Sequence, residues 1–179
     1  MRLPERVGDQ VRIGVAIQVP PPFGPRLQRA RAAFGDPLAT DIPPHVTIVG
    51  PTVVEAEDLP VVRKHIADVV AGHQPFTLHL RGTGTFRPVS AVVFVQVVQG
   101  IAECEQLERA VRSGPLAQDL RFNYHPHVTV AHDVAEDALD RAFDELAHFE
   151  AVFAVDTVQM YEHGDDGVWR PVEHFPLGR

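Results

Sequence analysis

The sequence PHVTI at residues 44–48 returns almost unchanged as PHVTV at residues 126–130. In each copy a histidine is followed two positions later by a threonine, and aliphatic residues fill the alternate positions. A period of two is typical of a β-strand, in which every second side chain points to the same face. Each copy is therefore predicted to direct an imidazole and a hydroxyl to one face and its aliphatic side chains into a core.

The two copies occupy matching places in an internal duplication. The motif histidines, His45 and His127, are 82 positions apart, and an aromatic-Arg-Pro-Val string recurs after 83 positions, at 86–89 and 169–172. Each half is predicted to run strand, helix, motif strand, helix, strand. A single four-residue string is a weak signal, but two copies at equivalent places in a duplicated frame indicate a common site.

Hydrophobic periodicity and turn residues predict the individual elements. Strands are expected at residues 11–19, 45–49, 76–80, 91–98, 149–155, 157–162 and 168–175, and helices at 25–34, 56–71, 101–113 and 135–147. The pair Gly50-Pro51 is expected to end the first motif strand, and residues 81–90 are expected to form a loop.

Length and composition are those of an ordinary globular protein. The 179 residues fit one domain or two small lobes that share a core, with 45% apolar and 22% charged residues. No apolar run is long enough for a membrane span, and the N-terminal segment is a poor signal peptide. The single cysteine, Cys104, allows no internal disulfide, so a reducing cytoplasmic location is expected, with a packed or idle thiol.

The net charge of −8 limits the class of partner. Proteins that grip long nucleic acids usually present a basic face, because neutralising the phosphate backbone dominates that affinity. We therefore expect no long duplex as a partner, and the lack of a long apolar run predicts no membrane partner. A nucleotide, a small phosphodiester or an RNA end remains compatible, and a monomer is the default expectation.

Paired imidazoles and hydroxyls suit phosphodiester cleavage without a metal. Such cleavage needs a base for the attacking oxygen, an acid for the leaving oxygen and donors for the phosphoryl charge. Histidine titrates near neutrality, so His45 and His127 can hold opposite protonation states and perform both proton transfers. The hydroxyls of Thr47 and Thr129 are suited to donate to the non-bridging phosphate oxygens.

These motifs resemble those of the two-histidine (2H) phosphoesterase superfamily, and in particular the bacterial RNA 2′-5′ ligase / 2′,3′-cyclic phosphodiesterase-like branch. The string GTGTF at residues 82–86 and the string FNYHPHVTVA at 122–131 are also similar to that branch, and the likeness spans about residues 11–175. It implies an α+β fold that is bilobal and internally duplicated, with two antiparallel sheets lining a central cleft and helices on the outside. Residues 1–179 would form a single domain whose lobes, about 11–90 and 91–175, can exchange strands.

The resemblance also implies an activity and roles for residues. It implies metal-independent hydrolysis of 2′,3′-cyclic phosphate ends of nucleotides or RNA, or of 2′-5′ linkages, with ligation as the reverse reaction and no cofactor. By this analogy His127 activates water, His45 protonates the departing ribose oxygen, and Thr47 and Thr129 bind the phosphate. The two histidine roles can also be exchanged.

Several readings stay open from sequence alone. Tyr124 precedes the second motif and is a candidate substrate-binding residue, and Phe86 fits either core packing or stacking on a base at the cleft. The histidines at 125, 127 and 132 invite a metal site, although no carboxylate or cysteine stands at a convincing spacing, and no metal is expected. A catalytically idle module that binds phosphate or RNA ends on the same fold is the alternative function.

Overall fold

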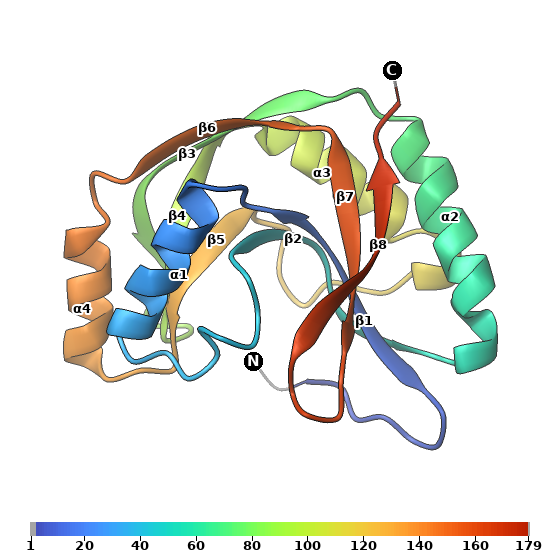
Figure 1. Cartoon of the computed structure of the whole chain (residues 1–179), viewed down its shortest axis with the longest axis horizontal. Coiled ribbons are helices and arrows are strands. Elements are labelled where there is room, and N and C mark those ends of the chain that lie inside the picture. Colours follow the sequence, from blue (N-terminus) through green and yellow to red (C-terminus); the bar gives the residue numbers. More distant parts are fainter. Residues whose placement is uncertain (1–2, 179) are drawn as a thin grey trace.

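The computed structural model describes residues 3–178 and places two four-stranded sheets beside four helices (Figure 1). The strands are β1 (Val11–Gln18), β2 (His45–Val54), β3 (Phe76–Thr85), β4 (Val92–Gln99), β5 (His127–His132), β6 (Glu150–Val155), β7 (Thr157–His163) and β8 (Trp169–Pro176). The helices are α1 (Phe23–Ala33), α2 (Leu59–Ala71), α3 (Ile101–Val111) and α4 (Glu136–Glu145). A short 3₁₀ turn, η1 (Ala56–Asp58), precedes α2, and another, η2 (Gly114–Leu116), follows α3.

Both sheets are antiparallel, and each has a motif strand at its edge. The strand order is β2-β1-β7-β8 in one sheet and β5-β4-β3-β6 in the other. The edge strands β2 and β5 contact each other where the two sheets meet. The α+β class, with two antiparallel sheets in two lobes, is therefore confirmed.

The sheets do not follow the order of the chain. Strand β3 comes from the first half of the sequence but pairs with β4 and β6 of the second sheet. Strands β7 and β8 come last in the chain and complete the first sheet beside β1. The lobe boundary expected near residue 90 falls between β3 and β4, which are neighbours in one sheet. Each sheet thus contains strands from both halves of the chain.

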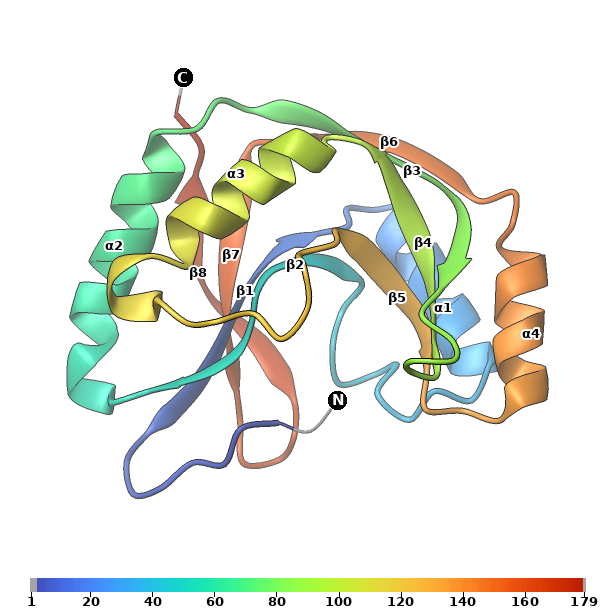
Figure 2. The same cartoon turned by 180° about the vertical axis from the view of Figure 1, so that it is seen from behind.

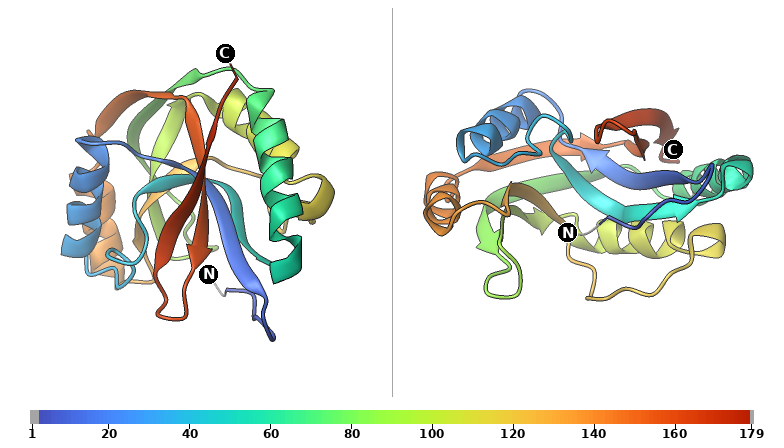
Figure 3. Two further views of the ribbon diagram at one scale, coloured as in Figure 1. Left: turned by 45° about the vertical axis from the view of Figure 1, so that its right-hand side comes forward. Right: turned by 90° about the horizontal axis from the view of Figure 1, so that it is seen from below.

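The helices lie outside the sheets, on two different sides (Figures 2 and 3). Helix α3 packs on β2 and helix α2 on β8, whereas α1 contacts β5 and α4 contacts β3, β4 and β5. Helix α1 precedes the motif strand β2 in the chain, and helix α3 precedes the motif strand β5. Each of these two helices packs on the motif strand of the other half, α3 on β2 and α1 on β5. None of the helices within residues 3–178 has the length and hydrophobicity that a bilayer span requires.

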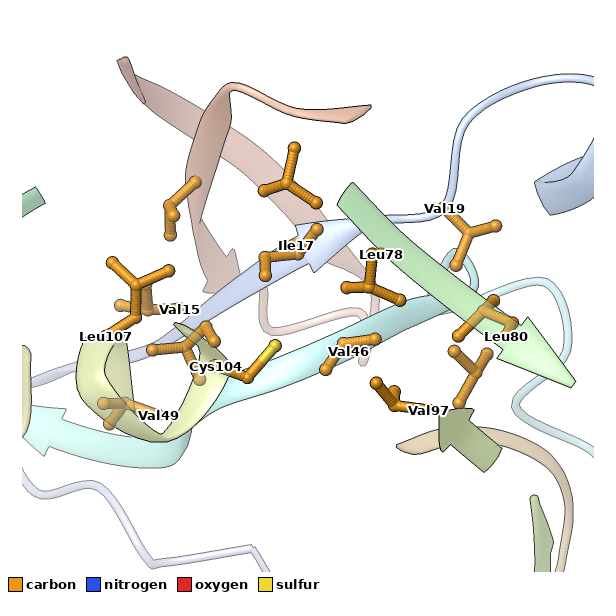
Figure 4. Close-up of a cluster of buried hydrophobic side chains, with 14 of the residues drawn as sticks. Val15, Ile17, Val19, Val46, Val49, Leu78, Leu80, Val97, Cys104 and Leu107 are labelled. Carbon is orange, nitrogen blue, oxygen red and sulfur yellow. The ribbon is translucent and has the colours of Figure 1, made fainter. Parts of the chain in front are cut away.

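One hydrophobic core links the two sheets. Figure 4 shows Val15 and Ile17 of β1 and Val46 of β2 packed with Leu78 of β3 and with residues of β4 and α3. Because antiparallel strands alternate their faces, the same strands leave polar side chains on the opposite side. Cys104 on α3 belongs to this core with none of its surface exposed, and burial raises the pKa of its thiol to about 12, which fits a packed thiol.

Two strand ends differ from the sequence-based expectation. Strand β2 does not stop at Gly50-Pro51 but continues to Val54, paired with Val11 of β1. Proline lacks a backbone donor, and β2 tolerates Pro51 because it is an edge strand. Strand β3 likewise continues beyond Leu80 through the predicted loop as far as Thr85.

The extension of β3 depends on a glycine. Gly84 pairs with Phe94 of β4, and the phenylalanine ring lies over it. A Cβ atom at residue 84 would stand 2.6 Å from two carbons of that ring, closer than real Cβ contacts. A glycine-rich string that reads as a loop in the sequence is therefore a strand that makes room for an aromatic side chain.

Candidate active site

The two motifs present their polar side chains as the alternation predicts. Val46, Ile48, Val128 and Val130 have at most 2% of their surface exposed, and they face the core. The histidines and threonines of both motifs are half-buried on the other face of their strands.

The fold brings the two motif strands together from distant parts of the chain. Strands β2 and β5 lie side by side at their first residues, which Figures 1 and 2 show from opposite sides. The hydroxyl of Tyr124, just before β5, donates a hydrogen bond of 2.8 Å to the carbonyl oxygen of Thr47 in β2. The hydroxyl of this candidate substrate-binding residue thus ties one motif strand to the other.

Both motif imidazoles are held in the same way. Nδ1 of His45 lies 2.7 Å from the carbonyl oxygen of Pro43, and Nδ1 of His127 lies 2.7 Å from that of His125. A carbonyl oxygen only accepts, so Nδ1 carries the proton in each ring and Nε2 is the acceptor of the neutral form. Neither Nε2 has a hydrogen-bond partner within residues 3–178, so both remain available to a substrate.

The pKa values of both histidines are lowered. Desolvation by burial, with smaller contributions from positive charge on His125 and His45, lowers the pKa of His127 to about 4, although its hydrogen bond to the His125 carbonyl acts in the opposite direction. Desolvation also lowers the pKa of His45, and the guanidinium of Arg31 adds to that effect. His127 is therefore neutral at physiological pH, as a general base must be.

An aromatic cluster surrounds His127. The ring centroid of Phe86 lies 5.0 Å from that of His127 at an interplanar angle of 88°, and the Phe94 ring lies at 5.1 Å and 56°. Phe86 and Phe94 are 4.4 Å apart, and His125 contacts both. Phe86, which the sequence offered for either core packing or base stacking, thus packs half-buried against a motif histidine.

The threonine hydroxyls are available to a ligand. Within the part of the chain that the structure describes, the side-chain hydroxyls of Thr47 and Thr129 make no hydrogen bond. Both threonines share a face with their histidine because they stand two positions along the same strand. Each motif therefore offers one imidazole nitrogen and one hydroxyl toward the same side.

Two glutamines that sequence reasoning missed flank the histidines. Gln18 at the end of β1 is the cross-strand partner of His45, and Gln96 in β4 is the partner of His127. Directly paired residues of an antiparallel ladder share a face, so each glutamine side chain projects from the same face as its histidine, although the amides themselves bond to Gln159 and to the Thr83 carbonyl. The two glutamines are 78 positions apart whereas the motif histidines are 82 apart, so spacing along the chain does not reveal that they match.

Other polar residues near the motifs are engaged elsewhere. Arg87 pairs with Glu136 and Asp140 of α4 at 2.8 Å each, and Arg170 pairs with Asp166. Within residues 3–178 no group of three or more His, Cys, Asp or Glu side chains is placed to hold a metal ion. The ring centroids of His125 and His127 are 5.9 Å apart, and His132 pairs with Asp133.

The arrangement of duplicated His-x-Thr strands at the junction of two sheets defines a class, the 2H phosphoesterases. Residues 19–167 match the model of the 2′-5′ RNA ligase superfamily, and the chain belongs to that family. The resemblance inferred from the motifs is thereby confirmed, and with it the class of enzyme, a phosphoesterase.

Relatives and solved structures agree with this membership. A putative phosphoesterase of Halalkalibacterium halodurans is 31% identical over 146 residues, which cover 80% of this chain and 85% of the relative. A putative phosphoesterase of Bacillus cytotoxicus is 27% identical and covers 80% and 84%. The fold is also that of E. coli LigT, crystallised with NADP+, with a TM-score of 0.68, 21% identity and coverage of 95% of this chain and 99% of LigT.

Proposed function

We propose that this protein hydrolyses 2′,3′-cyclic phosphate ends of nucleotides or RNA, or the related 2′-5′ linkages, by paired-histidine acid–base catalysis without a metal. The observation that carries the proposal is the matched pair of imidazoles. Each is fixed through Nδ1 to a backbone carbonyl and keeps Nε2 open beside a threonine hydroxyl. Their strands are neighbours where the two sheets meet.

In the proposed reaction His127 is the base and His45 the acid. Nε2 of neutral His127 takes a proton from water, and the water oxygen forms a bond to phosphorus. The bond between phosphorus and one ribose oxygen breaks, and that oxygen receives the proton from Nε2 of protonated His45. The products are a ribose hydroxyl and a phosphate monoester. Ligation follows the same scheme when a 5′-hydroxyl replaces water as the nucleophile, and its product is a 2′-5′ phosphodiester.

The proposed reaction has two further requirements: hydrogen-bond donors for the phosphoryl oxygens, and a protonated His45. The hydroxyls of Thr47 and Thr129 supply donors for the non-bridging oxygens. The pKa of His45 is lowered in the free protein, so its protonated form is scarce at neutral pH. A bound phosphate brings negative charge beside the imidazole and favours the protonated form, so substrate binding itself prepares the acid.

The nature of the substrate is supported by what E. coli LigT has been crystallised with. Its structures include complexes with 3′-AMP, with phosphate and with ATP. A phosphate-bearing nucleotide is therefore the substrate class that we propose for this chain, in agreement with its net charge of −8, which disfavours a long polyanion.

The test is turnover of 2′,3′-cyclic nucleotides in the presence of EDTA. We expect wild-type protein to hydrolyse them at an unchanged rate with the chelator. His45→Ala and His127→Ala are each expected to lose roughly 10²–10⁴ in kcat, because each removes one proton-transfer group. The variant His79→Ala is the matched control, because His79 lies in the second sheet and pairs with Glu150 away from the motifs.

Two results would contradict the proposal. Complete inhibition by EDTA would redirect the chemistry to a metal ion. Micromolar nucleotide binding without turnover of any cyclic phosphate or 2′-5′-linked substrate would indicate the alternative, an idle binding module on the same fold.

A further inference from the structure

The two halves of the duplicated site differ in one cross-strand position. Opposite Thr47 on β1 stands Ala16, whereas opposite Thr129 on β4 stands Phe94. The next strand outward reverses the sizes, with Gln159 beside Ala16 and Gly84 beside Phe94. The second half therefore carries a large aromatic ring on the motif face where the first half carries a methyl group.

The Phe94 ring is held between Gly84 of β3 and the ring of Phe86. Its ring lies over Gly84, where a Cβ would come within 2.6 Å of ring carbons Cε2 and Cζ. The Phe86 ring packs against it at 4.4 Å between centroids. Only 4% of the Phe94 surface is exposed. A ring held on two sides and nearly excluded from water has one orientation available to it.

This fixed ring in turn contacts the base. The centroids of Phe94 and His127 are 5.1 Å apart, and Phe86 closes on His127 edge-to-face at 5.0 Å. Within residues 3–178, His127 contacts other aromatic rings and His45 does not. His45 instead has its pKa lowered by the charge of Arg31, in addition to the larger effect of burial. The two imidazoles are each held by a backbone carbonyl, but the groups around them differ.

We propose that Phe94, seated on Gly84, is a positioning residue that orients the His127 imidazole and shields it from water, as the base of the proposed reaction requires. The role of His127 as the base rests on the proposed function, whereas its orientation and its shielding from water can be measured without any turnover. Phe94 touches the catalytic imidazole, and it acts on the reaction through that ring.

Shielding and charge act on His127 in the same direction. Desolvation is the largest cause of its lowered pKa, and charge on His125 and His45 adds to it. The nearest arginine of the β3–β4 connection, Arg87, is paired with two carboxylates of α4. A cation–π contact with the phenylalanine rings would favour the charged imidazole instead, so the direction of the change in a ring-deleted variant distinguishes the two effects.

The direct test is an NMR titration of the histidine C2 protons in wild type and Phe94→Leu, with the His127 signal assigned by its loss in His127→Asn. Leucine keeps an apolar side chain but removes the ring. We expect the pKa of His127 to rise by about one pH unit as water gains access. The matched control is Phe153→Leu, a change in β6 of the same sheet at a ring that packs on Phe23; it is expected to leave the His127 titration unchanged.

A second variant keeps the test valid if Phe94→Leu fails to fold. Gly84→Ala leaves Phe94 in the sequence but places a methyl group where the ring lies, so the ring must move. The same rise in the pKa of His127 is expected. In kinetics, both variants are expected to lower kcat about tenfold with little change in KM, and to move the acidic limb of the pH profile to higher pH. Phe94→Tyr keeps the aromatic ring, so it is expected to retain the wild-type kcat and pH profile.

An unchanged or lowered pKa of His127 in both Phe94→Leu and Gly84→Ala would overturn the inference. Absence of cyclic phosphodiesterase activity in wild type would instead overturn the proposed function, and the NMR result would still decide whether Phe94 positions and shields His127.

Discussion

Single residues decide the chemistry, and the two motif histidines differ in what surrounds them. Both are held through Nδ1 to a carbonyl two residues earlier. His127 adds a cage of aromatic rings, while His45 lies within the influence of the Arg31 guanidinium. Equivalent backbone positions have thus been given unequal environments, which is how one fold can hold an acid and a base of the same residue type.

A bell-shaped pH profile follows from these environments. The base works when deprotonated, so kcat/KM is expected to rise with pH through about 4, the pKa of His127. The acid works when protonated, so kcat/KM should fall as His45 loses its proton, on the acid side of 6.5 because desolvation lowers its pKa. Steady-state rates between pH 3.5 and 9 measure both limbs, and an acidic limb at 6.5 or above would contradict the assignment.

The threonine hydroxyls are expected to serve the transition state. Thr129→Val preserves the shape of the side chain and removes only the donor. We expect a loss of about 10²-fold in kcat, as for other single donors to a developing oxyanion, with a small change in KM. Thr157→Val in β7, whose hydroxyl donates to Asp156, is the control and should retain activity. Equal rates for Thr129→Val and wild type would remove this threonine from the site.

Sequence alone predicted the motif faces but not their neighbours. The period of two placed His45 and Thr47 on one face correctly, because alternation is a local property of any strand. Phe94 and Gln18 were missed, because their places beside the motifs depend on cross-strand register. That register shifts between Val93 and Phe94 and between Val15 and Ala16, so counting along the chain does not give it.

At the scale of secondary-structure elements, the end of α1 is fastened by a buried ion pair. Arg31 Nε and Asp36 Oδ2 are 2.7 Å apart, with 5% and 0% of their side chains exposed. The second carboxylate oxygen of Asp36 accepts from the backbone N–H of Leu38. The pair shapes the segment that leads to β2, and its guanidinium also acts on the pKa of His45.

Breaking this pair is expected to be costly. Asp36→Ala leaves the Arg31 charge buried without its partner, which typically costs about 3–5 kcal/mol. Urea denaturation measures the loss as a lower midpoint. The control is Asp68→Ala, which breaks the exposed pair with Lys64 on α2 and is expected to cost less than about 0.5 kcal/mol. Similar midpoints for the two variants would show that burial of the α1 pair contributes nothing.

Element types were predictable where periodicity was strong, and element ends were not. Within residues 3–178, the four helices and eight strands overlap the segments that apolar spacing and the two motifs predicted. Strand β3 was expected to end at Leu80, because Gly82 and Gly84 signal a loop in isolation. The partner strand β4 overrides that local signal by pairing Gly84 with Phe94, a tertiary contact without a trace in the local sequence.

The molecule as a whole is expected to unfold in one step despite its two lobes. A single buried cluster joins both sheets, and β3, β7 and β8 cross from one half of the chain to the sheet of the other. Trp169, the one tryptophan of the sequence, reports on the first sheet, while far-ultraviolet circular dichroism reports on both. Coincident urea transitions are expected from the two probes, and a separated fluorescence transition would show that the lobes unfold independently.

The two histidines act in one transition state if the proposed mechanism is right, so their effects cannot multiply. The decisive measurement is kcat for a 2′,3′-cyclic nucleotide, in EDTA, for His45→Ala, His127→Ala and the double variant. Each single variant is predicted to fall at least about 100-fold, and the double variant is predicted to fall little further than either. A double variant whose loss equals the product of the two single losses, or single variants that keep their activity, would contradict catalysis by a paired acid and base.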